Sequence, residues 1–90
     1  MAEYRIAETE SFRRKIRKPA FRGLYNKITE YVYPLLRNNP WFGPQIKRLK
    51  GEFKDVFRFR IGDYRVFYVV REETVLVIIL NIEHRKDAYR

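Results

Sequence analysis

The stretch FRFRIGDYRVFY, residues 57–68, has the pattern of two β-strands joined by a two-residue turn at residues 62–63. A turn of this length sets the pairing of the strands, so Arg60 is predicted to lie directly opposite Arg65. Side chains that lie opposite each other share one face of a sheet, and like charges in that position repel. Arg58 lies two residues from Arg60 on the same face. The hairpin therefore predicts a cluster of arginines that needs a physical explanation.

The alternation of side chains along the hairpin predicts two unlike faces. One face is apolar and is expected to pack under helices; it consists of Phe57, Phe59, Ile61, Tyr64, Val66 and Tyr68. The opposite face carries Phe67 and the arginines Arg58, Arg60 and Arg65. Arginine is always charged and offers a planar fork of donors that suits phosphate. A bound anion would therefore relieve the repulsion between these three arginines.

The last predicted strand, residues 74–83, is apolar on both sides, as expected for a strand inside a sheet. If residues 72–73 form the turn before it, Arg65 lies opposite Leu80. In that register the strand provides an apolar floor beside the arginines. A straight continuation of the strand also directs His84 to the arginine side of the sheet.

The first half of the chain predicts a short strand and two helices. Residues 3–8 alternate as in a strand, and Thr9 is a candidate N-cap for the helix that follows and should end before Pro19. Residues 22–39 have apolar side chains at helical spacing, with Pro34 as a kink or stop near the end. The segment after this helix allows a further turn of helix before the hairpin.

These elements follow in the order β-α-α-β-β-β. This order predicts an α+β domain with two N-terminal helices on one face of a small antiparallel sheet. A chain of 90 residues is too short for a second core, so residues 1–90 are expected to form a single domain.

The net charge of +9 favours a polyanion or an acidic protein as partner. Cysteine is absent and there is a single histidine, so neither a disulfide nor a zinc site is expected, and we predict no metal and no cofactor. The longest apolar run, residues 75–80, is too short to span a bilayer. The start of the chain has no signal-peptide pattern. We therefore expect a cytoplasmic location and no membrane partner.

The segment HRKDAYR, residues 84–90, collects side chains that suit RNA cleavage. RNA breaks when its 2′-hydroxyl attacks the adjacent phosphorus. This reaction needs a proton acceptor, stabilisation of the crowded phosphate and a proton for the leaving 5′-oxygen. Arginine can stabilise the phosphate but does not give up its proton, whereas histidine can accept or donate one. His84 and Tyr89 are therefore the candidates for proton transfer.

The motifs resemble the RelE/ParE superfamily of bacterial toxins. The resemblance covers residues 46–90 and rests on IKRLKG, on the hairpin and on the terminal HRKDAYR. It implies the RelE-like microbial RNase fold. For the RelE branch it implies a toxin of a type II toxin–antitoxin system, an endoribonuclease that cleaves mRNA in the ribosomal A site without a metal and so inhibits translation. The implied partners are a cognate acidic antitoxin, mRNA and the ribosome.

The resemblance also assigns roles to the basic residues. The phosphate-gripping arginine of the family hairpin corresponds to Arg65, and its late arginine corresponds to Arg85. Both are expected at the scissile phosphate. The residues expected to bind the flanking RNA phosphates are Arg58, Arg60, Lys50 and Lys54.

The general base is assigned differently from the best-known relatives. Some members have lysines at the positions of Arg58 and Arg60, and one of those lysines is considered the base. Arginine cannot easily take this role, so the resemblance favours His84, as in members with a histidine near the C-terminus. Tyr89 corresponds to the terminal tyrosine of the family, which would stack on the substrate or transfer a proton. The division of roles between His84 and Tyr89 stays open.

Two other functions fit the sequence. ParE-type members of the superfamily share the fold but inhibit DNA gyrase, and the histidine and tyrosine of the terminal segment argue against that branch. A basic RNA-binding module without catalysis would bind RNA in a salt-dependent way without cutting it.

Overall fold

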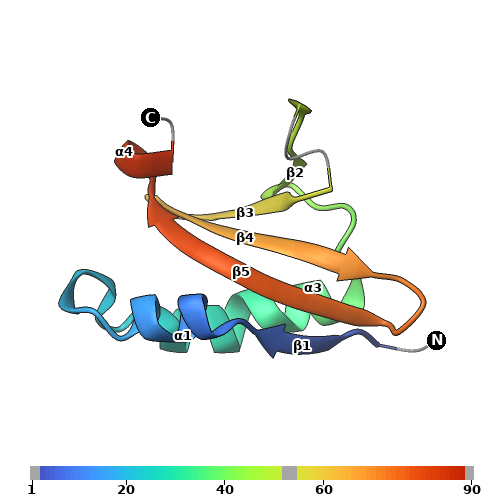
Figure 1. Cartoon of the computed structure of the whole chain (residues 1–90), viewed down its shortest axis with the longest axis horizontal. Helices are drawn as coiled ribbons and strands as arrows, with labels where there is room; N and C mark the ends of the chain where they lie inside the picture. Colours follow the sequence, from blue (N-terminus) through green and yellow to red (C-terminus); the bar gives the residue numbers. More distant parts are fainter. Residues whose placement is uncertain (1–2, 52–54, 89–90) are drawn as a thin grey trace.

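The structure is a computed structural model that describes residues 3–51 and 55–88, with the side chains of residues 87 and 88 outside the description. Along the chain its elements are β1 (Arg5–Glu8), α1 (Glu10–Ile16), η1 (Pro19–Phe21), α2 (Leu24–Lys27), η2 (Ile28–Val32), α3 (Tyr33–Asn38), β2 (Ile46–Arg48), β3 (Phe57–Ile61), β4 (Tyr64–Arg71), β5 (Leu76–His84) and α4 (Arg85–Ala88). In Figure 1 the N-terminal helices lie below a twisted sheet, and α4 rises from the end of β5 on the other side.

The strands form one five-stranded sheet in the order β1-β5-β4-β3-β2. The α+β class with helices on one face is confirmed. The sheet is mixed, however, because β1 runs parallel to β5 while the other neighbours are antiparallel. β1 covers the backbone groups that β5 would otherwise expose as an edge strand. The segment between the second helix and the first hairpin, which was expected to allow a turn of helix, contains the edge strand β2 instead, and β2 pairs with β3.

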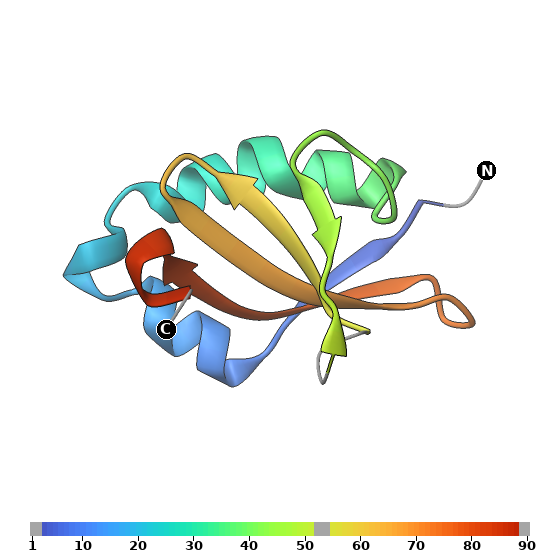
Figure 2. The same cartoon turned by 90° about the horizontal axis from the view of Figure 1, so that it is seen from above.

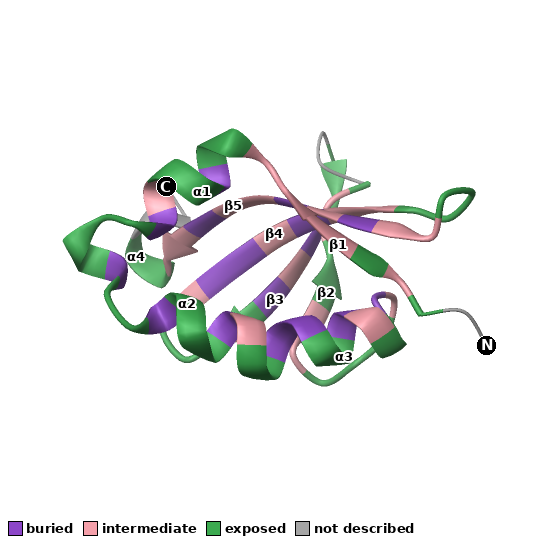
Figure 3. Ribbon diagram, turned by 90° about the horizontal axis from the view of Figure 1, so that it is seen from below, coloured by how far each residue is buried: buried purple, intermediate pink, exposed green. Residues whose placement is uncertain are grey.

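The core lies between the sheet and the helices. Figures 2 and 3 show these two layers from opposite sides, and Figure 3 marks the buried residues. All six residues of the predicted apolar hairpin face belong to this core or pack against it. From the helical side it is completed mainly by Phe12, Ile28, Val32 and Leu36, each of which is fully buried. The prediction that one face of the hairpin packs under the helices is therefore confirmed.

Thr9 is the N-cap of α1, as predicted. Its side-chain oxygen accepts a hydrogen bond from the backbone N–H of Phe12 at 3.1 Å. The Thr9 hydroxyl also donates to the carbonyl oxygen of Leu80 at 3.0 Å. A single side chain thus starts the helix and holds it against β5. Because β1 stops here, α1 takes over the position beside the second half of β5.

The second predicted helix is one continuous helical segment made of α2, η2 and α3. Pro34 does not end it. A proline cannot donate to the preceding turn and its ring crowds that turn. The chain accommodates this with a wider π-helical stretch, η2, immediately before Tyr33 and Pro34. Among the described residues, no helix has the length and apolarity that a membrane span requires.

The carboxylate of Glu8 ties β1 to the helical layer. Its Oε2 atom accepts hydrogen bonds from the hydroxyls of Tyr33 at 2.6 Å and Tyr25 at 2.7 Å. Burial raises the pKa of Tyr33 well above its ordinary value, and the hydrogen bond to Glu8 adds to the shift. The pKa of Tyr25 is also raised, chiefly by its hydrogen bond to Glu8.

We expect the raised pKa of Tyr33 to make the protein sensitive to alkali. Above about pH 10 the unfolded chain loses the phenolic proton while the folded protein keeps it, so rising pH favours unfolding. Below about pH 10 both states keep the proton of Tyr33 and the folded protein has its full stability. This stability is lost as the pH rises further. The free energy of unfolding of Tyr33→Phe should fall less steeply with rising pH than that of the wild-type protein, by about 1.4 kcal/mol per pH unit. Urea titrations between pH 9 and pH 12 would measure both slopes, and equal slopes would contradict the prediction.

The register of the first hairpin is confirmed in full. Arg60 lies opposite Arg65, and Ile61 lies opposite Tyr64. The turn uses Gly62 in the left-handed region, with φ of 58°, where a side chain would cause strain. Asp63 completes the two-residue turn.

The predicted register of the second hairpin is wrong. The loop is four residues long, Glu72 to Val75. A β-bulge in β5 follows, opposite the step from Phe67 to Tyr68 in β4. Glu83, not Leu80, consequently lies opposite Arg65. The two extra loop residues leave the faces of β5 unchanged, because side chains alternate with a period of two. The bulge shifts the pairing by one more residue and therefore reverses the faces of the second half of the strand.

Candidate functional site

The face of the sheet opposite the helices carries two rows of polar side chains. In the first row, Arg60 of β3, Arg65 of β4 and Glu83 of β5 lie side by side. The second row crosses four strands and consists of Lys47, Arg58, Phe67 and Asn81. We call these two rows the arginine face. Its cations come from β2, β3 and β4, and its carboxylate and amide come from β5.

Arg65 is the most buried polar residue of the arginine face, with only 6% of its surface exposed. Its Nη1 atom donates to the carbonyl oxygens of Tyr64 at 3.0 Å and Gly62 at 3.4 Å, which ties the guanidinium to the hairpin turn. Arg58 is half-buried and Arg60 is exposed. Arg65 is thus held in place, whereas Arg60 can adapt to a ligand.

Glu83 resolves part of the repulsion between the arginines. Arg65 lies between Arg60 on one side and Glu83 on the other. Opposite charges on directly opposite residues stabilise a sheet by about 0.2–1 kcal/mol, and like charges in that position destabilise it. The apolar floor expected beside the arginines is absent from this part of the sheet, because Asn81 and Glu83 occupy those positions.

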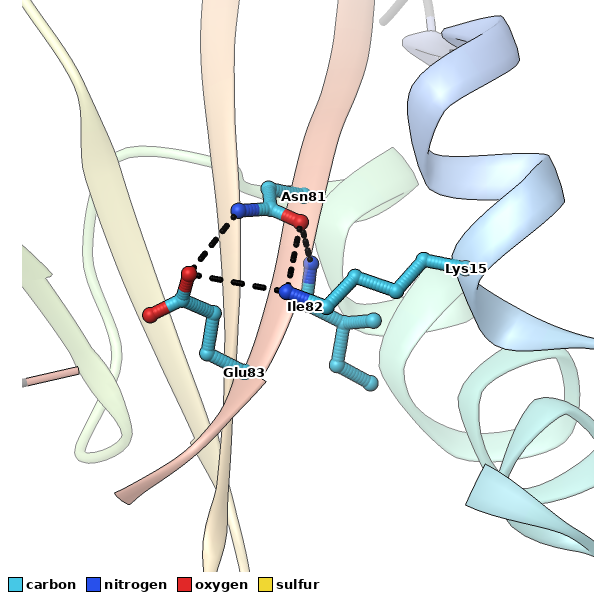
Figure 4. A network of polar contacts seen from close by, with 4 residues as sticks. All are labelled: Lys15, Asn81, Ile82 and Glu83. Carbon is cyan, nitrogen blue, oxygen red and sulfur yellow. Dashed lines mark hydrogen bonds and ion pairs between the residues drawn. The ribbon is translucent and has the colours of Figure 1, made fainter. Parts of the chain in front are cut away.

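A polar network fixes Glu83 (Figure 4). The Asn81 side chain donates to Glu83 Oε1 at 3.3 Å and accepts from the backbone N–H of Ile82 at 2.9 Å. Lys15 reaches across from α1, with its Nζ atom 3.4 Å from Asn81 Oδ1 and 3.5 Å from Glu83 Oε1. The side chains of Lys15 and Glu83 are 29% and 28% exposed. The network therefore joins α1 to the arginine face while leaving it open to solvent.

A basic groove adjoins this network between α1 and β5. It has a volume of about 440 Å³ and is lined by Ser11, Arg14, Lys15, Lys18, Leu80 and Asn81. Arg14 forms an ion pair with Glu10 at 2.8 Å. The groove extends the positive surface from the sheet onto α1.

His84 does not lie on the arginine face, contrary to the expectation from a straight strand. It is paired with Tyr64, whose side chain points to the helical layer and donates to the Ala20 carbonyl oxygen at 3.3 Å. The two rings meet edge to face with centroids 5.3 Å apart. The bulge in β5 is the physical cause, because it places Glu83 where His84 was expected.

One nitrogen of the His84 ring is already engaged. Nδ1 accepts a hydrogen bond from the backbone N–H of Lys86 at 3.2 Å. In the neutral ring the proton is therefore on Nε2, so Nε2 is a hydrogen-bond donor. Accepting a proton at Nε2 would require the other tautomer and the loss of the bond to Lys86.

Of the other predicted site residues, the structure describes Arg85 and Lys50. The backbone N–H of Arg85 donates to the carbonyl oxygen of Asp63 at 2.7 Å, which anchors α4 to the first hairpin turn. The Arg85 side chain is exposed, as is that of Lys50 just after β2. Tyr89 and Lys54 lie outside the described residues.

The sequence analysis gave no functional role to Lys15, Lys47, Asn81 and Glu83. Lys47 could have been found from the alternation of β2, had that short segment been recognised as a strand. The positions of Asn81 and Glu83 in the site depend on the bulge, which no local sequence pattern predicts. The position of Lys15 depends on the packing of α1 against β5. Within residues 3–51 and 55–88, no group of three or more histidine or carboxylate side chains is placed to hold a metal ion.

Residues 6–89 match the family described as the ParE toxin of the type II toxin–antitoxin system parDE. The chain belongs to this family. Membership of the ParE toxin family confirms the superfamily resemblance drawn from the hairpin and the terminal motif. The match includes almost all of the described residues, so the helical half belongs to the shared fold as well as the sheet.

Curated relatives of this ParE-family chain carry RelE-type names. It is 49% identical over 45 residues to the putative toxin RelE1 of Methanocaldococcus jannaschii, covering 50% of this chain and 49% of the relative. It is 41% identical over 44 residues to the toxin RelG of Mycobacterium tuberculosis, covering 49% of this chain and 51% of the relative. The chain thus spans about half the length of the curated relatives it matches.

The fold is similar over nearly its whole length to a solved toxin. The crystal structure of the toxin–antitoxin complex RelBE2 from Mycobacterium tuberculosis contains a chain that is 28% identical, with a TM-score of 0.79, covering 97% of both chains. The predicted RelE-like fold is therefore confirmed.

Proposed function

We propose that the chain is a metal-independent endoribonuclease toxin that cleaves mRNA in the ribosomal A site and thereby inhibits translation. The observation that supports this proposal most is the arginine face, with Arg58, Arg60 and Arg65 on adjacent strands. The three guanidiniums share one face of the sheet, and guanidinium groups bind phosphates, which an RNA chain supplies at regular spacing. Phe67 between Arg58 and Asn81 adds an aromatic surface on which a base can stack.

Each basic residue takes a position on the RNA in this proposal. Arg65, held by the hairpin turn, stabilises the charge on the scissile phosphate together with Arg85 at the start of α4. The residues that bind flanking phosphates are Arg58, Arg60, Lys50 and Lys54. α4 rises on the arginine-face side of the sheet, which is compatible with this role for Arg85 (Figure 1).

His84 and Tyr89 remain the proposed proton carriers. In the neutral ring Nε2–H of His84 can donate a hydrogen bond to the leaving 5′-oxygen. To donate a proton the ring must first be protonated at Nδ1, which breaks the bond from Lys86. Tyr89 follows α4 along the chain and would stack on the substrate or share the proton transfer.

The proposed protein partner is an acidic antitoxin. The solved relative RelBE2 is a toxin–antitoxin complex, and a chain with a net charge of +9 is electrostatically complementary to an acidic protein. We propose that toxin, antitoxin, mRNA and ribosome meet in the cytoplasm. Purification of the chain with its neighbouring gene product should yield a stoichiometric complex with a small acidic protein; its absence would contradict this part of the proposal.

Cleavage can be tested in a cell-free translation reaction with one defined mRNA. We expect new RNA ends at codon-phased positions when the purified protein is added, and their loss when translation initiation is blocked. An Arg65→Gln protein purified in the same way controls for contaminating nucleases. Cuts that persist after the block would instead indicate an endoribonuclease that acts without the ribosome.

The family description favours one alternative, a ParE-type inhibitor of DNA gyrase. Intact mRNA and normal translation in the same reaction, combined with inhibited supercoiling by purified gyrase, would favour this function. Salt-dependent RNA binding without cutting and without an effect on gyrase would instead favour a non-catalytic RNA-binding module.

A further inference from the structure

The β-bulge in β5 decides whether His84 or Glu83 lies on the same face of the sheet as Arg65. Without the bulge, His84 would share the face of the arginines. With it, Glu83 lies directly opposite Arg65 and His84 is paired with Tyr64 on the side of the helical layer. Side chains in such opposite positions have Cβ atoms about 4.5–5.5 Å apart. The side chain of Glu83 thus starts beside that of Arg65, the residue proposed to hold the scissile phosphate.

Glu83 is positioned with one oxygen engaged. Both described contacts of its carboxylate, from Asn81 and from Lys15, fall on Oε1. They set the orientation of the carboxyl group, and neither of them involves Oε2. The side chain is 28% exposed, so a substrate can reach it. This combination of an oriented carboxylate and solvent access suits a group that accepts a proton from a bound hydroxyl.

We propose that Glu83 is the general base of the cleavage reaction. This inference rests on the proposed ribonuclease function. Oε2 of Glu83 takes the proton of the 2′-hydroxyl, O2′ forms a bond to phosphorus, and the bond from phosphorus to the 5′-oxygen breaks. The products are a 2′,3′-cyclic phosphate and a 5′-hydroxyl. The proton for the leaving 5′-oxygen comes from a separate acid, a side chain or a bound water, on the same face as Glu83.

The placement of charges supports a base rather than a mere counter-charge for Arg65. A carboxylate that only balanced Arg65 would compete with phosphate for the same guanidinium. Instead, Lys15 of α1 and Asn81 of the same strand engage Glu83. Arg65 has its own backbone partners at the hairpin turn. The guanidinium and the carboxylate are therefore each held by separate groups, as two residues with different tasks require.

Glu83→Gln tests the proposal, because it keeps the shape of the side chain and its contact with Asn81. With the toxin in excess over the defined mRNA in the translation reaction, we expect the single-turnover cleavage rate to fall by about 10²–10⁴-fold. RNA binding should be unchanged or tighter, since one negative charge is lost. Glu10→Gln makes the same change of charge on the exposed surface of α1 and should cleave at the wild-type rate.

An mRNA with sulfur in place of the 5′-bridging oxygen at the mapped cut separates base from acid, because a thiolate leaves without a proton. We expect this substrate to restore cleavage to a variant that lacks the acid, but not to Glu83→Gln. Wild-type rates in Glu83→Gln, or rescue of its defect by sulfur, would overturn the assignment while leaving the ribonuclease function intact. No cleavage by the wild-type protein would instead refute the ribonuclease function itself.

Discussion

Replacing Arg65 by glutamine is expected to lower the single-turnover rate of mRNA cleavage by about 10²–10³-fold, the usual effect of losing one group that stabilises developing charge. Arg65 is the most constrained cation of the arginine face, because the hairpin turn holds Nη1 through two carbonyl oxygens. A preorganised guanidinium needs little rearrangement when charge accumulates on the phosphate. Glutamine retains donors but removes the positive charge.

The matched control is Arg71→Gln on the same strand. Arg71 is exposed and lies at the far end of β4, about 20 Å from Arg65 at the usual rise of a strand. It should cleave at nearly the wild-type rate. Arg65→Lys keeps the charge without the planar fork and should show a smaller loss than glutamine. Since Arg65 is buried, urea denaturation must show that each variant is folded at the assay temperature. Equal rates for the Arg65 and Arg71 variants would contradict the assignment.

Replacing Tyr68 should have the largest effect on stability. Its side chain is fully buried, its ring stacks on Phe57 with centroids 5.6 Å apart, and its hydroxyl donates to the Pro40 carbonyl oxygen at 2.8 Å. Tyr68→Ala leaves a cavity between the sheet and the loop after α3, and should lower the free energy of unfolding by about 3–5 kcal/mol. Tyr68→Phe keeps the ring and loses only the hydrogen bond, which should cost about 1–2 kcal/mol.

Tyr64→Phe is the control for the hydroxyl of Tyr68. The Tyr64 hydroxyl also donates to a backbone carbonyl, that of Ala20, but at 3.3 Å and at the surface, where water can replace it. We expect a loss of less than about 0.5 kcal/mol, as for most surface changes. Urea denaturation at pH 7 would measure all three variants. If both phenylalanine variants lost the same free energy, the buried bond to Pro40 would not be the cause.

Much of the fold is predictable because its determinants are local. The two-residue turn fixes the register of the first hairpin, so the pairing of Arg60 with Arg65 follows from the sequence. The capping role of Thr9 and the apolar side of the hairpin follow from similarly local patterns. Family membership is also readable, because the hairpin and the terminal segment are continuous motifs.

The composition of the site depends on interactions between distant parts of the chain. Lys15 is 66 residues from Asn81 in sequence and meets it only because α1 packs beside β5. Lys47 joins the arginine face through the pairing of the short strand β2 with β3. Such contacts depend on the packing of whole elements, so no spacing within one segment indicates them.

The hairpin sequence is enough to place three arginines on one face, since a short turn and an alternation of period two leave a single register. Only the tertiary structure decides which residue stands beside them. A four-residue loop and one bulge put Glu83 on that face and His84 on the other. The physical reason is that a strand with apolar residues on both sides has no preferred face of its own. Its register is set by the packing of Ile79 and Ile82 into the core beneath it.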